Sequence, residues 1–247
     1  MRLIVVDDYD QLSRKAAELI QGQIEDKPSS VLGLATGSTP VGTYEALIAI
    51  HKNENLSFDQ VTTFNLDEYY GLDEAHDQSY HSFMQTNLFS HINVKPEATH
   101  IPSGQPEDVD VHCKVYEERI AMAGGIDLQL LGLGRNGHIG FNEPGTRFEE
   151  RTRLVDLTQD TIDANARFFE SEADVPKQAI SMGIKTIMKA KEVLLLVSGE
   201  AKADTVRRMI YGPVTKDLPA SVLQLHPNVT IVMDKAAASR LENRGIA

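Results

Sequence analysis

Short apolar runs of four to six residues recur along this chain and alternate with segments that have the spacing of amphipathic helices. The apolar runs, whose length and content suit buried strands, are Leu3–Val6, Val31–Ala35, Val61–Leu66, Leu128–Leu131, Val193–Val197 and Val229–Met233. The helical segments are Gln11–Ile24, Pro40–His51, Ser79–His91, Val109–Ala123, Lys202–Ile210 and Ala220–His226. Such alternation predicts an α/β fold, a mainly parallel sheet with helices on both faces. Ligands bind beyond the carboxyl ends of the strands in sheets of this kind.

The length of 247 residues suits one α/β domain. No internal repeat, low-complexity tract or linker rich in proline and serine divides the chain, so we predict a single domain over residues 1–247. The formal net charge of −12 disfavours nucleic acid and anionic membranes as partners. No signal peptide or membrane-spanning run is present, and the single cysteine, Cys113, suits a reducing compartment. These features predict a cytoplasmic protein.

The loop Gly132–Gly145, GLGRNGHIGFNEPG, follows a predicted strand and gathers glycines, a histidine, asparagines and a glutamate. Glycine gives the backbone conformations closed to other residues, and loops at strand ends commonly carry function. Histidine ordinarily titrates near neutrality, and Asn136 and Glu143 are close enough in the sequence to orient His138. We therefore interpret this segment as a catalytic loop.

The start of this loop also matches the dinucleotide-binding pattern G-x-G-x-x-G. That pattern requires a helix that opens at its third glycine and holds a pyrophosphate at its N-terminus. Gly140, Pro144 and Gly145 stand where the interior of such a helix would run, which argues against a dinucleotide. An ordinary glycine-rich turn is the other alternative, although such turns rarely gather these polar side chains.

The loop Thr36-Gly37-Ser38-Thr39 follows a second predicted strand and precedes a helical segment. We expect Thr39 to cap that helix and Pro40 to be its first residue. Gly37 allows a tight turn, which leaves amides and hydroxyls facing one point beside the positive helix end. This arrangement predicts a cradle for a phosphate or a carboxylate. No lysine follows in the Walker pattern, so a nucleoside triphosphate is not indicated.

Two further loops belong to the same edge of the predicted sheet. Asp67 and Glu68 follow Val61–Leu66, where a carboxylate suits general-base work or metal binding. We expect one acid to do chemistry and the other to support it; a helix cap followed by a solvated acid is the alternative. Lys202 follows Val193–Val197 and supplies a cation. The histidines are scattered and form no compact ligand set with a carboxylate, so we predict no metal.

The segment at about residues 149–177 departs from the alternation, because it is polar and charged and has few features of a core element. It predicts a lid segment that moves over the site. A surface helix that does not move is an equally good interpretation of this sequence.

Four segments in order along the chain together resemble the glucosamine-6-phosphate deaminase family: ATGSTP (Ala35–Pro40), TFNLDEYYGL (Thr63–Leu72), GLGRNGHIGFNEPG (Gly132–Gly145) and ANARFF (Ala164–Phe169). The resemblance extends over nearly the whole chain. It implies a modified doubly wound sheet, shared with sugar-phosphate isomerases and lactonases. It also implies that glucosamine 6-phosphate and water are converted to fructose 6-phosphate and ammonium, in amino-sugar catabolism and with no cofactor.

The resemblance also implies roles for individual residues. Asp67 matches the base that moves a proton from carbon 2 towards carbon 1 of the sugar. His138 matches the acid–base group that opens the pyranose ring, with Glu143 holding its imidazole. Asn136 stands where many members carry Asp; an amide orients a partner but cannot ionise. The substrate-binding residues implied are Thr36, Gly37, Ser38 and Thr39 as the phosphate loop, with Arg167 and Lys202 as its cationic partners.

Three alternatives are set against this interpretation. A 6-phosphogluconolactonase-like hydrolase shares the fold and a phosphate loop, but has no need of Asp67 together with the His138–Glu143 pair. A non-catalytic sugar-phosphate sensor would normally bring a DNA-binding segment, and here the first strand is expected at Leu3. An inactive homologue would be expected to have lost one of the three acid–base residues.

We expect the protein to be a monomer or a small homo-oligomer. Larger members of the family are hexamers that N-acetylglucosamine 6-phosphate activates at a site between subunits. Those members carry a basic residue two positions beyond an arginine that matches Arg153, and here that position is Val155. A valine cannot pair with phosphate, so we predict no activation by this ligand.

Overall fold

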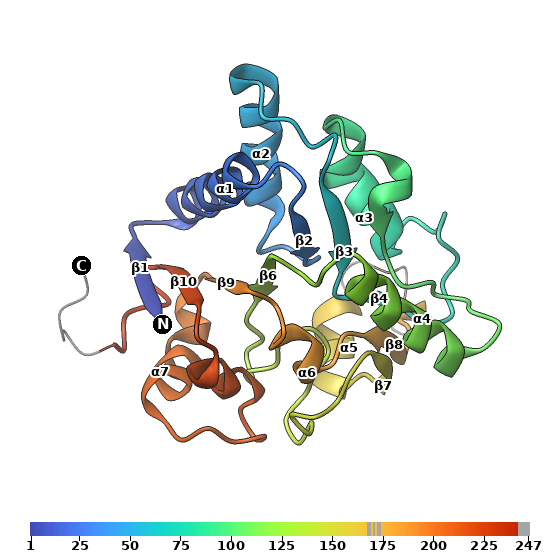
Figure 1. Cartoon of the computed structure of the whole chain (residues 1–247). Helices are drawn as coiled ribbons and strands as arrows, with labels where there is room; N and C mark the ends of the chain where they lie inside the picture. The colour runs from blue at the N-terminus through green and yellow to red at the C-terminus, as the bar shows by residue number, and fades with distance from the viewer. Residues whose placement is uncertain (167–168, 170, 172–173, 242–247) are drawn as a thin grey trace.

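The computed structural model describes residues 1–166, 169, 171 and 174–241, and its centre is a seven-stranded sheet (Figure 1). The strand order is β1-β10-β9-β6-β2-β3-β5, and every neighbouring pair is parallel. The strands are β1 (Arg2–Val6), β2 (Val31–Leu34), β3 (Thr62–Asn65), β5 (Thr99–His100), β6 (Leu128–Gly132), β9 (Glu192–Val197) and β10 (Val229–Asp234). All the strands expected from the apolar runs are therefore confirmed. The short edge strand β5 was not expected.

The helices cover both faces of this sheet, as predicted. They are α1 (Tyr9–Asp26), α2 (Val41–Glu54), α3 (Tyr80–Asn87), α4 (Val109–Met122), α5 (Gln159–Ala166), α6 (Ile184–Ile187) and α7 (Ala203–Tyr211), with 3₁₀ turns at Phe89–His91, Pro96–Ala98, Glu200–Lys202 and Pro219–Leu225. The helical segment expected over Ala220–His226 corresponds to the 3₁₀ helix Pro219–Leu225. The helix expected over Ser79–His91 ends at Asn87 and is followed by another such turn.

Successive side chains of one strand enter two different cores. In β9, Leu194 and Leu196 pack with α1 and α2, whereas Val193, Leu195 and Val197 pack with α4, α6 and α7. Figure 1 shows α1 and α2 above the sheet and α6 and α7 below it. Because both faces are buried here, β9 is apolar at consecutive positions from Val193 to Val197 rather than at alternate positions. This is why continuous apolar runs identified the strands.

A second sheet of three antiparallel strands, in the order β4-β8-β7, lies beside the first. Its strands are β4 (Asp67–Tyr69), β8 (Gln178–Ser181) and β7 (Arg153–Asp156). Asp67 pairs with Ser181 and so opens a strand, whereas the sequence placed it in a loop. Part of the segment 149–177 is likewise structured, because it contains β7 and α5. Its movement as a lid stays a prediction.

The order of the strands identifies where a ligand would bind. The chain continues from β2 to β3 and β5 on one side, and from β6 to β9 and β10 on the other. The connections that follow β2 and β6 therefore diverge, and a crevice forms beyond the carboxyl ends of these neighbours. Among the described residues, no helix is both long enough and apolar enough to cross a bilayer.

Candidate active site

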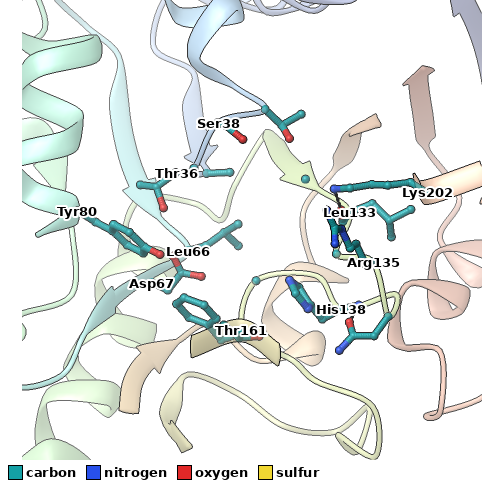
Figure 2. Close-up of a pocket in the computed structure, with 18 of the residues that line it drawn as sticks. Thr36, Ser38, Leu66, Asp67, Tyr80, Leu133, Arg135, His138, Thr161 and Lys202 are labelled. Carbon is teal, nitrogen blue, oxygen red and sulfur yellow. Dashed lines mark hydrogen bonds between the residues drawn. The ribbon is translucent and has the colours of Figure 1, made fainter. Parts of the chain in front are cut away.

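A cavity of about 960 Å³ opens at the carboxyl ends of β2, β3 and β6. Its volume is typical of a site for a small molecule. Figure 2 shows Asp67 and Tyr80 on one side and His138 and Arg135 on the other, with Thr36 and Ser38 above them and Lys202 reaching in. Of the residues expected in the site, the cavity is lined by Thr36, Gly37, Ser38, Thr39, Asp67, Asn136, His138 and Lys202. Arg167 lies outside the described residues.

Glu143 lies behind His138 rather than on the cavity wall. Its Oε1 is 3.4 Å from Nδ1 of His138, and its Oε2 accepts a hydrogen bond of 2.6 Å from Nδ2 of Asn136. The Oδ1 of Asn136 in turn accepts from the backbone amide of His138 at 3.1 Å. Burial of Glu143 opposes its ionisation, but contacts with His138, Thr161 and Asn136 outweigh burial and lower its pKa to about 2. Glu143 is therefore an anion at neutral pH and lies against the imidazole.

Glycines determine the shape of the loop that carries His138. A side chain at Gly134 would overlap the imidazole, since a Cβ there would lie 2.4 Å from ring atoms of His138. The amide of Gly134 donates to the carbonyl of His138 at 3.0 Å, which closes the loop. Gly137 has a φ of 89°, a conformation that other residues rarely adopt. The glycine spacing that imitates a dinucleotide motif thus gives the histidine its place beside the cavity.

Asp67 faces the cavity from the opposite side and is 6% exposed. Burial, followed by the charge of Glu68, raises the pKa of Asp67 to about 8. A carboxyl group with such a pKa is matched to proton transfer near neutrality. Gly140, at a φ of 54°, brings the histidine loop close to this carboxyl group, because a Cβ there would lie 3.6 Å from Oδ2 of Asp67.

The neighbouring acid, Glu68, points away from the cavity. Its Oε1 accepts from the amides of Tyr69 and Tyr80, and its Oε2 accepts from the amide of His81 and lies 2.9 Å from the Nδ1 of that ring. Glu68 therefore fixes the start of α3 against β4. Glu68 thus has the contacts of a supporting acid, and the reacting role of Asp67 stays a prediction. The contact with His81 was not predicted, because nothing in the local sequence pairs the two residues.

The loop Thr36–Thr39 meets the cavity beside the start of α2, and Gly37 has a φ of 92°. Thr39 does not cap α2; Pro40 is in the capping position, and no side chain there makes a capping hydrogen bond. That prediction was wrong because the helix begins one residue later, at Val41. Tyr9 of α1 does bind the loop, and its hydroxyl lies 3.0 Å from the carbonyl oxygens of both Ser38 and Thr39 and accepts from the amide of Gly42 at 2.9 Å.

Two cations line the cavity, Lys202 and Arg135. Neither has a carboxylate within ion-pair distance among the described residues, and the Nζ of Lys202 donates to the carbonyl of Leu133. Burial, followed by the charge of Arg135, lowers the pKa of Lys202. A buried cation that faces another cation favours an anionic ligand. Arg135 was not expected in the site, although it is the loop's only basic side chain besides histidine.

Aromatic rings close the side of the cavity next to Asp67. Tyr80 and Phe141 line it and stack with their ring centres 6.3 Å apart, and Tyr69 contacts both rings. These rings form an apolar wall on the side of the cavity to which Asp67 belongs. Tyr80 was not expected in the site, because it is the contact of α3 with Glu68 of β4, distant in the sequence, that brings this side chain to the cavity. Within the described part of the chain, no group of three His, Cys, Asp or Glu side chains is arranged to hold a metal ion.

Residues 7–232 match the family model described as glucosamine-6-phosphate isomerases and 6-phosphogluconolactonase. A glucosamine-6-phosphate deaminase of Clostridioides difficile is 56% identical over 241 residues, which cover 98% of this chain and 97% of that protein. Another, from Clostridium botulinum, is 53% identical over 242 residues and covers 98% and 99%. These relatives span essentially the full length of the chain.

Solved structures resemble the whole fold. One described as a monomeric glucosamine-6-phosphate deaminase has a TM-score of 0.95 at 49% identity and covers 97% of this chain and 99% of its own. A 6-phosphogluconolactonase from Leishmania guyanensis has a TM-score of 0.76 at 21% identity, with 98% of both chains covered. The second likeness shows the fold alone.

Proposed function

The chain belongs to the family of glucosamine-6-phosphate isomerases and 6-phosphogluconolactonases, and we propose that it converts glucosamine 6-phosphate and water to fructose 6-phosphate and ammonium. The observation that carries this proposal is a buried carboxyl group of raised pKa, Asp67, which faces the His138–Glu143 pair across one cavity. Deamination of this sugar needs both groups, because a ring must open before a proton can leave carbon 2.

His138 serves the first step, ring opening. The ring hides the aldehyde, and a proton must leave the hydroxyl at carbon 1 and reach the ring oxygen before the ring opens. The imidazole of His138 lines the cavity, and the Glu143 anion lies behind it. This anion stabilises the imidazole while the imidazole carries the proton that is being transferred. Asn136 holds Glu143 in this position.

Asp67 serves the second step, the transfer of a proton between carbons. Its carboxylate removes the proton from carbon 2 of the open sugar while the ammonium group loses a proton and the aldehyde oxygen gains one, which gives an enol that carries a neutral amine. Asp67 then delivers its proton to carbon 1. Carbon 2 is then an imine, to which water adds before ammonia leaves. The buried setting of Asp67 favours an uncharged carboxyl group, so the protonated amine of the substrate assists its ionisation by supplying an opposite charge.

The substrate's phosphate is held at the other end of the cavity. The backbone and hydroxyl groups of Thr36, Gly37, Ser38 and Thr39 lie there beside the N-terminus of α2, with the cations of Lys202 and Arg135. Amides at a helix N-terminus and unpaired cations both favour a phosphate dianion. We include Arg167 among the phosphate ligands on the family resemblance alone. Binding at this remote group positions the reacting end between Asp67 and His138.

We further infer that the protein acts as a monomer in the cytoplasm. The solved relative of TM-score 0.95 is described as monomeric, and the single cysteine, Cys113, is buried and forms no disulfide. We assign no partner beyond the sugar phosphate, because the net charge of −12 disfavours nucleic acid and anionic membranes.

The test is to incubate the purified protein with glucosamine 6-phosphate and to measure both products. We expect ammonium and fructose 6-phosphate in equal amounts, with Asp67→Asn protein as the negative control. The same protein is assayed with 6-phosphogluconolactone. Hydrolysis of the lactone without release of ammonium would contradict the proposal and favour the lactonase alternative.

A further inference from the structure

One oxygen of Glu143 faces two partners, and one of them lies outside the catalytic loop. Oε1 accepts a hydrogen bond of 2.5 Å from the hydroxyl of Thr161 and lies 3.4 Å from Nδ1 of His138. Thr161 belongs to α5 and is 6% exposed, so its hydroxyl is shielded from water. The shorter contact of this carboxylate oxygen is therefore with a helix that follows the loop, not with the histidine.

The two oxygens of Glu143 are held by different parts of the chain. Asn136, in the same loop, binds Oε2, and Thr161, on α5, binds Oε1. The Nδ1 of His138 is buried and makes no hydrogen bond in the part of the chain that the structure describes. The position of Oε1 relative to the imidazole consequently depends on where Thr161 holds it.

A hydroxyl that donates to a buried carboxylate has two effects. It favours the ionised form, because the anion accepts the stronger hydrogen bond, and it restricts rotation of the carboxylate. Without Thr161, the bond from Asn136 is the one that remains to the Glu143 carboxylate among the described residues, and the carboxylate can turn about it. The imidazole then loses a well-placed anion at Nδ1.

We propose that Thr161 is a positioning residue for the acid–base pair, whose hydroxyl places Oε1 of Glu143 against His138 and makes this placement depend on α5. This deepens the proposed function, on which its kinetic consequence rests. Thr161 also lines the cavity, but the role assigned to its hydroxyl is exerted through Glu143. The segment that carries α5 thereby has a direct connection to the ring-opening group.

The experiment compares Thr161→Val, which keeps the shape but removes the hydroxyl, with Thr161→Ser, which keeps the hydroxyl. Thr186→Val is the matched control. Thr186 is also buried and donates at 2.5 Å to a glutamate, Glu117, but on α6 and outside the cavity. Steady-state kinetics with glucosamine 6-phosphate are combined with NMR titration of the Glu143 carboxyl carbon in the free protein.

We expect Thr161→Val to lower kcat roughly tenfold or more while KM changes little, because a hydrogen bond to a charged group is lost. The pKa of Glu143 should rise in the same variant. Thr161→Ser should restore both properties, and Thr186→Val should change neither, even if it lowers Tm. A Thr161→Val protein with an unchanged Glu143 titration, or a Thr161→Ser protein as impaired as Thr161→Val, would overturn the proposal.

The two measurements also separate this inference from the proposed function. If the protein does not release ammonium from glucosamine 6-phosphate but Thr161→Val still raises the pKa of Glu143, the proposed function fails and the positioning role stands. If Thr161→Val does not fold, Thr161→Ala replaces it with the same expected titration. An unchanged Glu143 titration in that variant would likewise contradict the role of the hydroxyl.

Discussion

Asn136 donates a hydrogen bond of 2.6 Å from its Nδ2 to Oε2 of Glu143 and makes no hydrogen bond to the imidazole of His138 in the described structure. Its hydrogen bonds therefore reach the ring through the Glu143 carboxylate and through the backbone of His138. The Asn136 amide stabilises the Glu143 anion without adding a charge of its own. Of Asn136 and Glu143, Glu143 therefore supplies the negative charge beside the imidazole of His138.

Replacing Asn136 with Asp would bring two carboxylates into contact at this point. Like charges so close disfavour a second ionisation, so we expect the pKa of Glu143 to rise by roughly one unit or more. The shift is measured by NMR titration of the Glu143 carboxyl carbon in the free protein, because Asp67 sets the acid limb of kcat/KM. Asn136→Ala removes the donor without adding charge and should raise the pKa of Glu143 less. Equal pKa values of Glu143 in the wild type and Asn136→Asp would contradict this prediction.

Asp67→Asn should bind the sugar phosphate almost normally but turn it over far more slowly. Loss of a positioned base typically costs about 10²- to 10⁴-fold in rate. Exchange of the carbon 2 proton with deuterated solvent should fall together with kcat, since both depend on the same proton transfer. Asp59→Asn, an exposed change outside the cavity, is the control. Near-normal exchange in Asp67→Asn would mean that another group removes the proton.

The raised pKa of Asp67 also predicts how stability and rate depend on pH. Its folded value of about 8 exceeds its usual value of 3.8, so its contribution to the free energy of unfolding is complete below the usual value. That contribution is lost as the pH rises to about 8. The Tm of the wild type minus the Tm of Asp67→Asn should therefore fall as the pH rises from 3.8 to about 8, and should then stay constant at higher pH. A Tm difference that is constant with pH would contradict the raised pKa.

The same ionisation should be visible in the rate. Because the base must be a carboxylate, kcat/KM of the free enzyme should rise with pH until Asp67 is ionised, at about 8. The substrate's amine assists that ionisation, so the corresponding rise in kcat should occur at lower pH. Profiles of both constants, measured on one preparation, check this difference.

The main sheet was predictable because a strand buried on both faces is encoded by a run of consecutive apolar residues. Leu194 and Val193 enter different cores, so the run Val193–Val197 has to be apolar throughout. The strands of the second sheet are not encoded by such apolar runs. Its strands are three or four residues long, and β4 pairs with a strand more than a hundred positions later. Neither length nor local pattern distinguishes them from a loop.

The cavity shows the same division between local and distant causes. The loops that follow β2 and β6 can be recognised in the sequence by their glycines and polar residues, and both loops line the cavity. Tyr9, Tyr80 and Thr161 act on these loops from helices elsewhere in the chain. The residues that flank each of these three side chains have the pattern of a helix and contain no motif that indicates a site. Only the packing of α1, α3 and α5 reveals what these side chains contact.

Lys202→Ala should weaken binding of glucosamine 6-phosphate far more than binding of unphosphorylated glucosamine. A hydrogen bond assisted by charge contributes about 1.5–3 kcal/mol, which corresponds to roughly a tenfold to hundredfold loss of affinity. Arg135→Ala should have a smaller effect, because this side chain is exposed and its charge is screened by solvent. Lys189→Ala, outside the cavity, is the control. Equal losses for both sugars in binding assays would show that Lys202 does not contact phosphate.

The last prediction concerns control by N-acetylglucosamine 6-phosphate, which activates larger members of the family this chain resembles. The side chain of Val155, at the position of their basic residue, packs against the apolar cluster of Tyr69, Phe141, Leu157 and Ala179. The guanidinium of Arg153 is already engaged, since it donates to Oδ1 of Asn142 at 3.1 Å. A phosphate at this position would meet an apolar surface and an occupied cation.

Without useful affinity at a second site, no coupling free energy can reach the first. We therefore expect the initial rate to depend hyperbolically on glucosamine 6-phosphate, with no activation by the acetylated sugar phosphate. Rates are measured over a range of substrate concentrations with and without this ligand. Val155→Lys serves as a comparison; because a lysine there would still lack a partner subunit in a monomer, it should leave the curve hyperbolic. A sigmoidal curve that the ligand makes hyperbolic in the wild-type protein would show a regulatory site and overturn this prediction.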